Sequence, residues 1–397
     1  MASDNGTYTL RWGIMATGLI AERFCNDLLA DPGARQVYDI RHEIVAVSSS
    51  TSLEKAADLV AKINSPVAAK LHVSYASLVA DPDVDIVYVA TPHSHHFQNA
   101  MLALVAGKHV LCEKALTVTA AQAKKLVETA RSKGLFFMEA VKTRFFPASR
   151  EIRALIASGE IGTVYRTFAD MSFNENSDSA DGTVKYADGH RLVNASLAGG
   201  ALLDLGVYPL TWIFQSLYHM QPETEKEAPV ILSASSQYRT GVDEATSVIC
   251  HFPKHSSTGI ATTSIRVGTN PHASAANAPA VRIQGSRGEI QVPHPAGRPL
   301  SYTIVKADGD GKPQVVECPV PVDPQRGAGH GMFWQADECA RCLMAGLKES
   351  SEMPWAESVA VMEAIESALQ QGGVRYPDLI TTDIFDPTSP LNTGIRE

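Results

Sequence analysis

The chain has 397 residues, of which 45% are hydrophobic and 19% charged, and its formal net charge is −9. This length predicts two domains, and the composition is typical of a soluble globular protein. The acidic balance argues against a nucleic-acid-binding surface and against a basic membrane-binding patch. Residues 1–10 lack the apolar core of a signal peptide, and we expect no window with the roughly 18 apolar residues of a membrane span.

Cysteine and histidine give no signal for disulfides or metal. Cys339 and Cys342 form a CxxC pair, but no second pair or histidine cluster accompanies it. The closely spaced His93, His95 and His96 lack a carboxylate or cysteine that would complete a ligand set. We therefore expect no bound metal, reduced thiols and a reducing, cytoplasmic location.

Residues 9–15 predict a first strand, followed by a tight turn and a helix. The turn partly matches the dinucleotide fingerprint GxGxxG/A, because Gly18 and Ala21 fill the second and third positions while Ala16 stands in the first. The second glycine lets a pyrophosphate approach the backbone, and the helix N-terminus favours phosphate. An ordinary strand-to-helix turn remains the alternative. The residues predicted to bind the dinucleotide here are Ala16, Thr17, Gly18, Leu19 and Ile20.

A second strand, 42–47, ends in a run of hydroxyl side chains that begins with Ser48, Ser49 and Ser50. An NAD site would place an acidic residue at this strand end to hold the ribose 2′-hydroxyl. Serines leave room for a 2′-phosphate and can donate hydrogen bonds to it, which favours NADP over NAD. The alternative is that these serines only mark a flexible loop.

Strands and helices alternate up to residue 140, as successive βαβ units require. The strand 108–112 leads into Glu113 and Lys114. Parallel sheets bind ligands beyond the carboxyl ends of their strands, so Lys114 is expected to lie in such a crevice.

After Pro147 the pattern changes. A helix entered through Gly199 and Gly200 carries Asp204 and Tyr208, which share one helical face because they are four residues apart. Successive strands between residues 230 and 317 indicate a mixed or antiparallel sheet. We predict an α/β fold, with a Rossmann domain over residues 1–147 and an α+β domain with a large open, mostly antiparallel sheet over residues 148–397.

Several segments together resemble the glucose-fructose oxidoreductase, inositol dehydrogenase and rhizopine-catabolism (Gfo/Idh/MocA) family. They are WGIMATGLIA, VATPHSHH, CEKA, MEAVKTRFFP and GGALLDLGVYPLTW, and they follow one another in the family's order over nearly the whole chain. The last two are similar to the subgroup of NADP-dependent D-xylose 1-dehydrogenases and dimeric dihydrodiol dehydrogenases. This resemblance implies a homodimer formed through the C-terminal open sheet.

The resemblance also implies site residues. Lys114 matches the lysine of the family's Glu-Lys-Pro motif, with Ala115 in place of the proline. Tyr208 matches the subgroup's tyrosine, and Asp204 matches the aspartate one turn before it. On the cofactor side it implies contacts from Glu113, Lys114, Thr91, Pro92, His96 and Arg144, and on the substrate side from Lys114, Phe146, Arg191, Asp204 and Tyr208.

The chain departs from the subgroup at Lys142, which stands where the subgroup often has tryptophan. Apart from the resemblance, we expect the side chains that select the sugar to line the pocket from 144–147, 174–191 and 265–279.

The implied reaction is NADP-dependent oxidation of D-xylose at C1 to the lactone, with hydride transfer to nicotinamide C4. Such a reaction needs a base for the hydroxyl proton. We predict Tyr208 as the base with Lys114 beside it, because an ammonium stabilises a phenolate. Lys114 as the base and Tyr208 as the orienting group is the alternative, and Asp204 orients the sugar or keeps Lys114 charged. Other candidate functions are a trans-1,2-dihydrodiol dehydrogenase and a non-catalytic NAD(P)-binding regulator.

Overall fold

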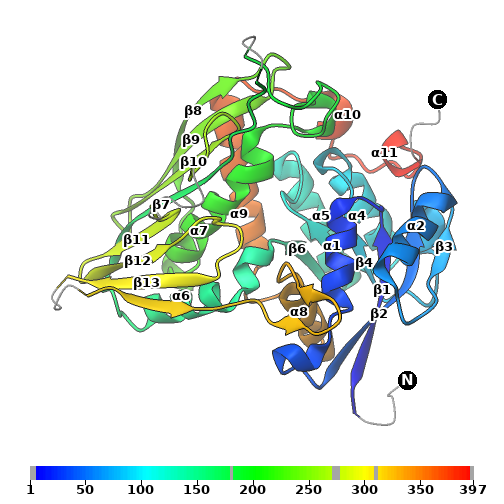
Figure 1. The fold of residues 1–397 in the computed structure, drawn as a ribbon. Helices are drawn as coiled ribbons and strands as arrows, with labels where there is room; N and C mark the ends of the chain where they lie inside the picture. The colour runs from blue at the N-terminus through cyan, green and yellow to red at the C-terminus, as the bar shows by residue number, and fades with distance from the viewer. Residues whose placement is uncertain (1–5, 179–181, 271–277, 308–311, 394–397) are drawn as a thin grey trace.

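A computed structural model describes residues 6–178, 182–270, 278–307 and 312–393. Figure 1 shows two β-sheets side by side, with helix α9 (Trp355–Gln371) between them. The N-terminal third of the chain forms one sheet with its helices. The strands from residue 164 onwards, mostly green and yellow, form the other.

The first sheet has six parallel strands in the order β3-β2-β1-β4-β5-β6. Strand order reverses between β1 and β4, the switch point at which such sheets bind ligands. The predicted alternation of strand and helix is confirmed, although the short β3 and α3 were not foreseen. The strands are β1 (Tyr8–Met15), β2 (Ile40–Ser48), β3 (Lys70–His72), β4 (Ile86–Val89), β5 (His109–Glu113) and β6 (Phe137–Ala140).

Helices cover both faces of this sheet, which is why β4 and β6 are buried along their whole length. One face packs on α1 (Leu19–Leu28) and α2 (Leu53–Ile63). The other packs on α3 (Tyr75–Val79), α4 (His96–Val105) and α5 (Ala120–Lys133). The C-terminal helix α8 (Phe333–Met344) joins the α1 face, so residues far apart in sequence share one core.

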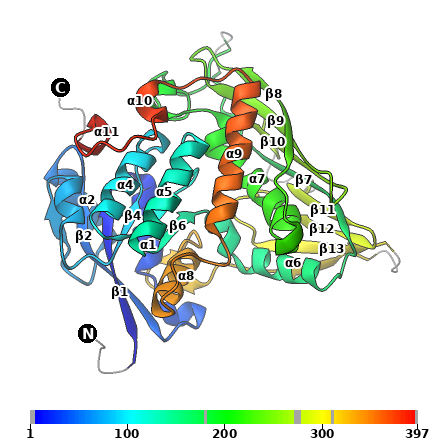
Figure 2. The same cartoon turned by 180° about the vertical axis from the view of Figure 1, so that it is seen from behind.

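The second sheet has eight strands in the order β14-β13-β12-β11-β7-β10-β9-β8. Only β7 and β10 pair in parallel, so the prediction of a large, mostly antiparallel sheet is confirmed. Helices α7 and α9 pack against one of its faces (Figure 2). The strands are β7 (Val164–Ser172), β8 (Val230–Gln237), β9 (Asp243–Phe252), β10 (Ser257–Ser264), β11 (Val281–Gly285), β12 (Gly288–Val292), β13 (Ser301–Lys306) and β14 (Gln314–Glu317).

Shorter elements connect and close the two sheets. They are α6 (Pro147–Ala157), the ribbon β15 (Val322–Asp323) and β16 (Gly327–Ala328), α10 (Asp378–Thr381) and α11 (Pro390–Thr393).

A long helix crosses the second half of the molecule. Helix α7 (Val207–Ile213) is continued at both ends by π-helical turns, Leu202–Gly206 and Phe214–Tyr218. The stretch 195–218 is long and apolar enough to cross a membrane, which corrects the expectation that no window would be. Its most apolar window is 83% buried inside the protein, as expected for the core helix of a globular fold.

Candidate active site

A cavity of about 460 Å³ lies where the carboxyl ends of β1, β4 and β5 face the long helix. Both halves of the chain contribute to its wall, so neither half encloses it alone. The lining residues are Ala16, Gly18, Leu19, Ile20, Arg23, Ala90, Thr91, Pro92, His93, His96, Glu113, Lys114, Lys142, Met171, Phe173, Arg191, Leu197, Asp204, Leu205 and Tyr208.

Lys114 contacts two other residues that line this cavity, Asp204 and Tyr208. Its Nζ donates to the Asp204 carbonyl oxygen at 2.6 Å and to Asp204 Oδ1 at 3.1 Å. It also lies 4.9 Å from the centre of the Tyr208 ring, on the ring face. The expected grouping of Lys114, Asp204 and Tyr208 is therefore present in three dimensions.

Charge pairing holds Lys114 protonated. Burial lowers the pKa of Lys114, but the nearby charges, Asp204 first, outweigh burial, so its pKa is raised. Burial raises the pKa of Asp204, but Lys114 and then Arg191 outweigh it and hold that pKa well below its usual range. Arg191 Nη1 donates to Asp204 Oδ1 at 3.0 Å. The Asp204 carboxylate is thus paired with two cations, Lys114 and Arg191, and both cations remain charged near neutral pH.

Local backbone structure presents Asp204 to Lys114. In the π-helical turn that precedes α7, a carbonyl normally accepts from the amide five residues later. For Asp204 that residue is Pro209, which has no N–H. The Asp204 carbonyl is therefore open to Lys114, which donates to it.

The loop that follows β12 packs against the Tyr208 ring. A Cβ built on Gly297 would lie 3.0 Å from the Tyr208 ring, so a larger residue there would press on the ring. Thr143 Oγ1 donates to the Gly297 carbonyl at 2.9 Å, and Trp212 Nε1 donates to the Ala296 carbonyl at 2.8 Å. These bonds tie the loop to both halves of the molecule.

The turn after β1 fits the phosphates of a dinucleotide. Ala16 has φ +86°, a conformation that glycine adopts at less cost, which explains why a glycine is usual at this position. Gly18 caps α1, and a Cβ there would meet no atom within 4 Å. Leu19 is 62% exposed at the start of the helix. Thr17, between Ala16 and Gly18, does not line the cavity.

The serine run lies next to this turn. Ser48 pairs with Met15 across the parallel strands, and Ala16 N donates to the Ser48 carbonyl at 3.0 Å. Ser48 Oγ is buried without a hydrogen-bond partner among the described residues. Ser49 Oγ lies 3.1 Å from Thr51 Oγ1, and Ser50 is partly buried. Ser48 and Ser49 are buried, and none of Ser48–Ser50 lines the large cavity itself, so the run lies next to the phosphate turn with Ser50 as its partly exposed member.

The loop after β4 lines the same cavity as Lys114. Thr91 Oγ1 is buried and has no partner in the described part of the chain. His96 is buried, and its two ring nitrogens lie 2.9 Å from the carbonyl oxygens of Thr91 and Ala115. Burial lowers the pKa of His96 to about 4, and a neutral ring has one N–H, so it donates to one of these two carbonyls at a time. The Lys114–Ala115 peptide bond is cis.

Glu113 completes this wall. Tyr88 Oη donates to Glu113 Oε1 at 2.5 Å. Burial raises the pKa of Glu113 against the Tyr88 hydrogen bond and the nearby Lys114.

The remaining cations of the cavity have no carboxylate of their own. Lys114 and Arg191 share Asp204, whereas Arg23 and Lys142 form no ion pair with any residue that the structure describes. Both line the cavity, and Arg23 belongs to α1. Their positive charge suits the cavity to phosphate oxygens. Sequence reasoning missed Arg23, whose only signal was its place one turn into the predicted helix.

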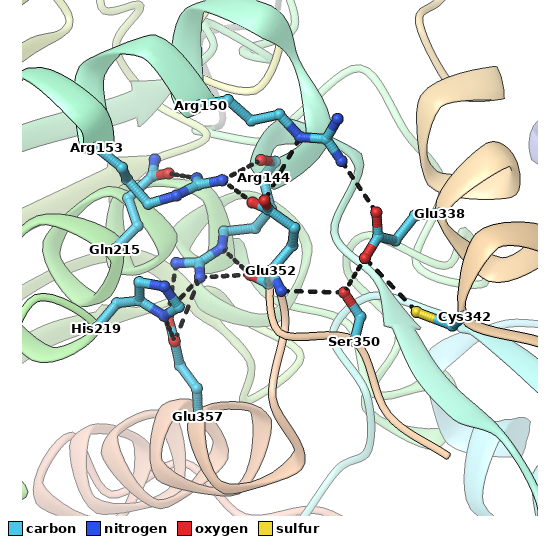
Figure 3. A network of polar contacts seen from close by, with 10 residues as sticks. All are labelled: Arg144, Arg150, Arg153, Gln215, His219, Glu338, Cys342, Ser350, Glu352 and Glu357. Atoms are coloured by element: carbon cyan, nitrogen blue, oxygen red, sulfur yellow. Dashed lines mark hydrogen bonds and ion pairs between the residues drawn. The ribbon is translucent and has the colours of Figure 1, made fainter. Parts of the chain in front are cut away.

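Arg144 does not lie on the cavity, which corrects its assignment to the cofactor. Its side chain is fully buried and pairs with Glu357, Nη1 to Oε1 at 2.6 Å. Its Nε donates to the Glu352 carbonyl at 2.9 Å, and Arg153 and His219 join the same network (Figure 3). Arg144 thus binds the first turn of α9 through Glu357 and does not reach the cavity where a ligand would bind.

Phe146 is also misassigned. Its ring is fully buried and packs edge-to-face on Trp334 with centroids 4.8 Å apart. The apolar side chains that do line the cavity are Met171 and Phe173, at the end of β7. Of the expected specificity regions, 144–147 contributes none of the lining residues, 174–191 contributes Arg191, and 265–279 contributes none. Residues 179–181 and 271–277 lie outside the described part of the chain.

His93 lines the cavity although the prediction passed over it. Its Nδ1 lies 3.3 Å from the Ala198 carbonyl, and burial lowers its pKa to about 3. No group of three potential metal-binding side chains occurs among the described residues.

Comparison with known proteins agrees with this geometry. Residues 10–141 match the model of the oxidoreductase family with a NAD-binding Rossmann fold, and residues 149–291 match the Gfo/Idh/MocA C-terminal domain. The chain is 63% identical to D-xylose 1-dehydrogenase (NADP+) of Hypocrea jecorina, over 99% of this chain and 100% of that protein. It is 34% identical to trans-1,2-dihydrobenzene-1,2-diol dehydrogenase of Bos taurus, over 93% and 98% of the two chains.

Solved structures share the fold. A levoglucosan dehydrogenase in complex with NADH and levoglucosan superposes with a TM-score of 0.76 at 18% identity, over 92% of this chain and 98% of that one. The aldose-aldose oxidoreductase of Caulobacter crescentus gives a TM-score of 0.72 at 21% identity over the same shares. The chain therefore belongs to the Gfo/Idh/MocA family of oxidoreductases.

Proposed function

We propose that this protein is an NADP-dependent sugar dehydrogenase that oxidises D-xylose at C1 to the lactone. The observation that carries the proposal is the Lys114 ammonium, held between the Asp204 carboxylate and the Tyr208 ring beside a dinucleotide turn. The 63% identity to the Hypocrea jecorina D-xylose 1-dehydrogenase supports the sugar and the cofactor.

The chain's own residues fit NADP. The α1 N-terminus at Gly18, with Leu19 and Ile20, is suited to the pyrophosphate, and Arg23 and Lys142 complement its charge. The serine run Ser48, Ser49 and Ser50 lies beside this turn, and its partly exposed member, Ser50, is the one within reach of a 2′-phosphate. Thr91, Pro92, His96 and Glu113 line the wall next to Lys114. NADP supplies the hydride acceptor when it is bound.

Tyr208 Oη accepts the proton of the sugar hydroxyl in this proposal. Lys114 is the weaker candidate for the base, because its raised pKa keeps it protonated at neutral pH. As an ammonium on the ring face, Lys114 stabilises the negative charge that develops on Tyr208. Asp204 keeps Lys114 charged and in place, and its second cation, Arg191, is available to sugar hydroxyls.

Steady-state turnover tests the proposal. D-xylose and NADP should give an absorbance increase at 340 nm, and kcat/KM should be at least tenfold higher with NADP than with NAD. A trans-dihydrodiol serves as the competing substrate, because the Bos taurus relative carries that name. A higher kcat/KM with the dihydrodiol would make the dihydrodiol the substrate in place of D-xylose. If NADP is reduced with neither substrate, the proposed function is overturned.

The organisation of the protein is part of the same proposal. We place the domain boundary at Pro147, with residues 1–147 holding NADP and 148–397 holding the sugar, and with α8 packed onto the first domain. Six buried free thiols support a reducing, cytoplasmic location.

A homodimer is supported by the second sheet. The paired residues Leu232, Ile249, Ile260 and Phe168 form an apolar row across β8, β9, β10 and β7. Leu232 is 56% and Ile249 39% exposed. Two copies of this face would bury the row. Sedimentation equilibrium tests it, and a monomer at micromolar concentration would contradict it.

A further inference from the structure

Two of the three side chains at the proposed catalytic centre lie on one helix, so its first turn determines where they meet Lys114. That turn follows Gly199 and Gly200, and Asp204 N donates to the Gly200 carbonyl at 3.4 Å. Gly200 has φ +124°, and a Cβ on Gly199 would lie 2.8 Å from the Arg191 carbonyl oxygen. The chain therefore enters the helix through a tightly packed turn that only glycines allow.

Asp243, at the start of β9, packs against this turn. It is fully buried, and its Oδ2 accepts from Leu202 N at 2.8 Å and from Thr246 Oγ1 at 2.9 Å. The first amides of a helix lack partners within the helix, and a carboxylate is a strong acceptor for them. Asp243, 41 positions away along the chain, thus provides the hydrogen-bond acceptor that a capping residue next to the helix usually provides.

The other carboxylate oxygen packs against Gly200 but accepts no hydrogen bond from any described residue. Asp243 Oδ1 is buried without a hydrogen-bond partner among the described residues, and a Cβ on Gly200 would lie 2.2 Å from it. A buried carboxylate that is only partly paired destabilises the fold. Stability alone does not explain an aspartate here.

We propose that Asp243 is a positioning residue: through the Leu202 amide it fixes the first helical turn and sets where Asp204 and Tyr208 meet Lys114. The inference rests on the proposed dehydrogenase function and adds a residue that touches neither substrate nor cofactor. Its effect is transmitted through one backbone amide, two residues before Asp204.

The charge on Asp243 depends on pH. Burial raises the pKa of Asp243 to about 6, against the hydrogen bonds from Thr246 and Leu202 that lower it. Two other titratable side chains contact this turn: the hydroxyl of Tyr376, which follows α9, donates to the Gly199 carbonyl at 2.6 Å, and His93 Nδ1 lies 3.3 Å from the Ala198 carbonyl. The carboxylate is therefore the charged acceptor at the helix start only above about pH 6.

The test is Asp243→Asn, which keeps the shape and removes the charge. We expect kcat to fall by about tenfold or more, since small displacements of reacting groups have effects of this size, while the Kd for NADP is unchanged. The melting temperature at pH 8 should be equal or higher, because a buried charge has been removed. A purely structural role would lower kcat and melting temperature together. The difference between the wild-type and variant pH profiles of kcat should have its midpoint near pH 6.

Thr246→Val is the matched control, since it removes the other donor to the same oxygen and should change kcat less than twofold. Hydrogen exchange provides a readout that needs no substrate: the Leu202 amide should be protected in the native protein and exchange faster, with residues 203–208, in Asp243→Asn. An unprotected Leu202 amide, or a variant with kcat within twofold of wild type, would overturn the inference. Absence of xylose turnover in the wild-type enzyme with an intact exchange difference would instead overturn only the proposed function.

Discussion

Replacing Lys114 by methionine tests the core of the site. The variant keeps an apolar stem of similar length and removes the ammonium that lies 4.9 Å from the Tyr208 ring centre. Unit charges at that distance interact by about 3 kcal/mol at an effective dielectric constant of about 20. If the ammonium stabilises the developing phenolate by that amount, kcat should fall by a few hundredfold, on the order of 10² to 10³.

Two measurements on the variant separate chemistry from binding. NADPH formation at saturating xylose and NADP gives kcat, and quenching of protein fluorescence gives the Kd for NADP, which should change less than threefold. Lys124→Met is the control, because Lys124 is 53% exposed and pairs with Glu363 on the surface of α5. A Lys114→Met enzyme with kcat within threefold of wild type would refute the electrostatic role. Normal kcat with weakened NADP binding would make Lys114 a cofactor ligand only.

Three further substitutions address other parts of the structure. Lys142→Met should raise the Kd for NADP and for NAD by a similar factor, about tenfold, because Lys142 lines the cavity, forms no ion pair with the described residues and is proposed to meet the pyrophosphate; a loss confined to NADP would place it at the 2′-phosphate instead. Arg144→Met should lower the free energy of unfolding by about 3–5 kcal/mol in urea titrations, since it leaves the buried Glu357 carboxylate with the His219 ring but without its guanidinium partner, while the Kd for NADP stays the same; weakened NADP binding without destabilisation would contradict this. Burial raises the pKa of Glu139 to about 7, so the stability that this carboxyl contributes while protonated is lost as the pH rises towards 7. Glu139→Gln should therefore raise the free energy of unfolding by about 2 kcal/mol at pH 8 and change it little at pH 5, and an equal change at both pH values would exclude the titration of Glu139.

Matched controls are available for two of these substitutions. Lys62 is 64% exposed next to Glu22 and does not line the cavity, so Lys62→Met should leave dinucleotide binding unchanged. Arg150 is 42% exposed in its pairs with Glu338 and Glu352, so Arg150→Met should lower the free energy of unfolding by less than about 1 kcal/mol.

The long helix combines stability with function. Its residues 195–218 are apolar enough to resemble a membrane span, yet they form the interior wall between the two sheets. A π-helical turn and a proline interrupt its regular hydrogen bonding at Asp204. The carbonyl released there accepts from Lys114, so the local irregularity in the helix is part of the site geometry.

Sequence periodicity determined much of this protein. Alternating strands and helices predicted the parallel sheet, because side-chain burial repeats with a short, local period. The position of Lys114 after a buried strand predicted its place in the cavity, and the four-residue spacing of Asp204 and Tyr208 predicted that they would face it together.

Only the tertiary structure shows which side chains pair with one another and which ones face the cavity. Arg144 and Phe146 lie close in sequence to the cavity residue Lys142, but both side chains turn into the interior, where Glu357 and Trp334 receive them. Arg23 lines the cavity because its helix face is turned towards it. Asp243 reaches Leu202 from a strand 41 residues away. The partner of a charged side chain is set by packing between segments that are distant in sequence. The spacing of residues within one segment does not predict that packing.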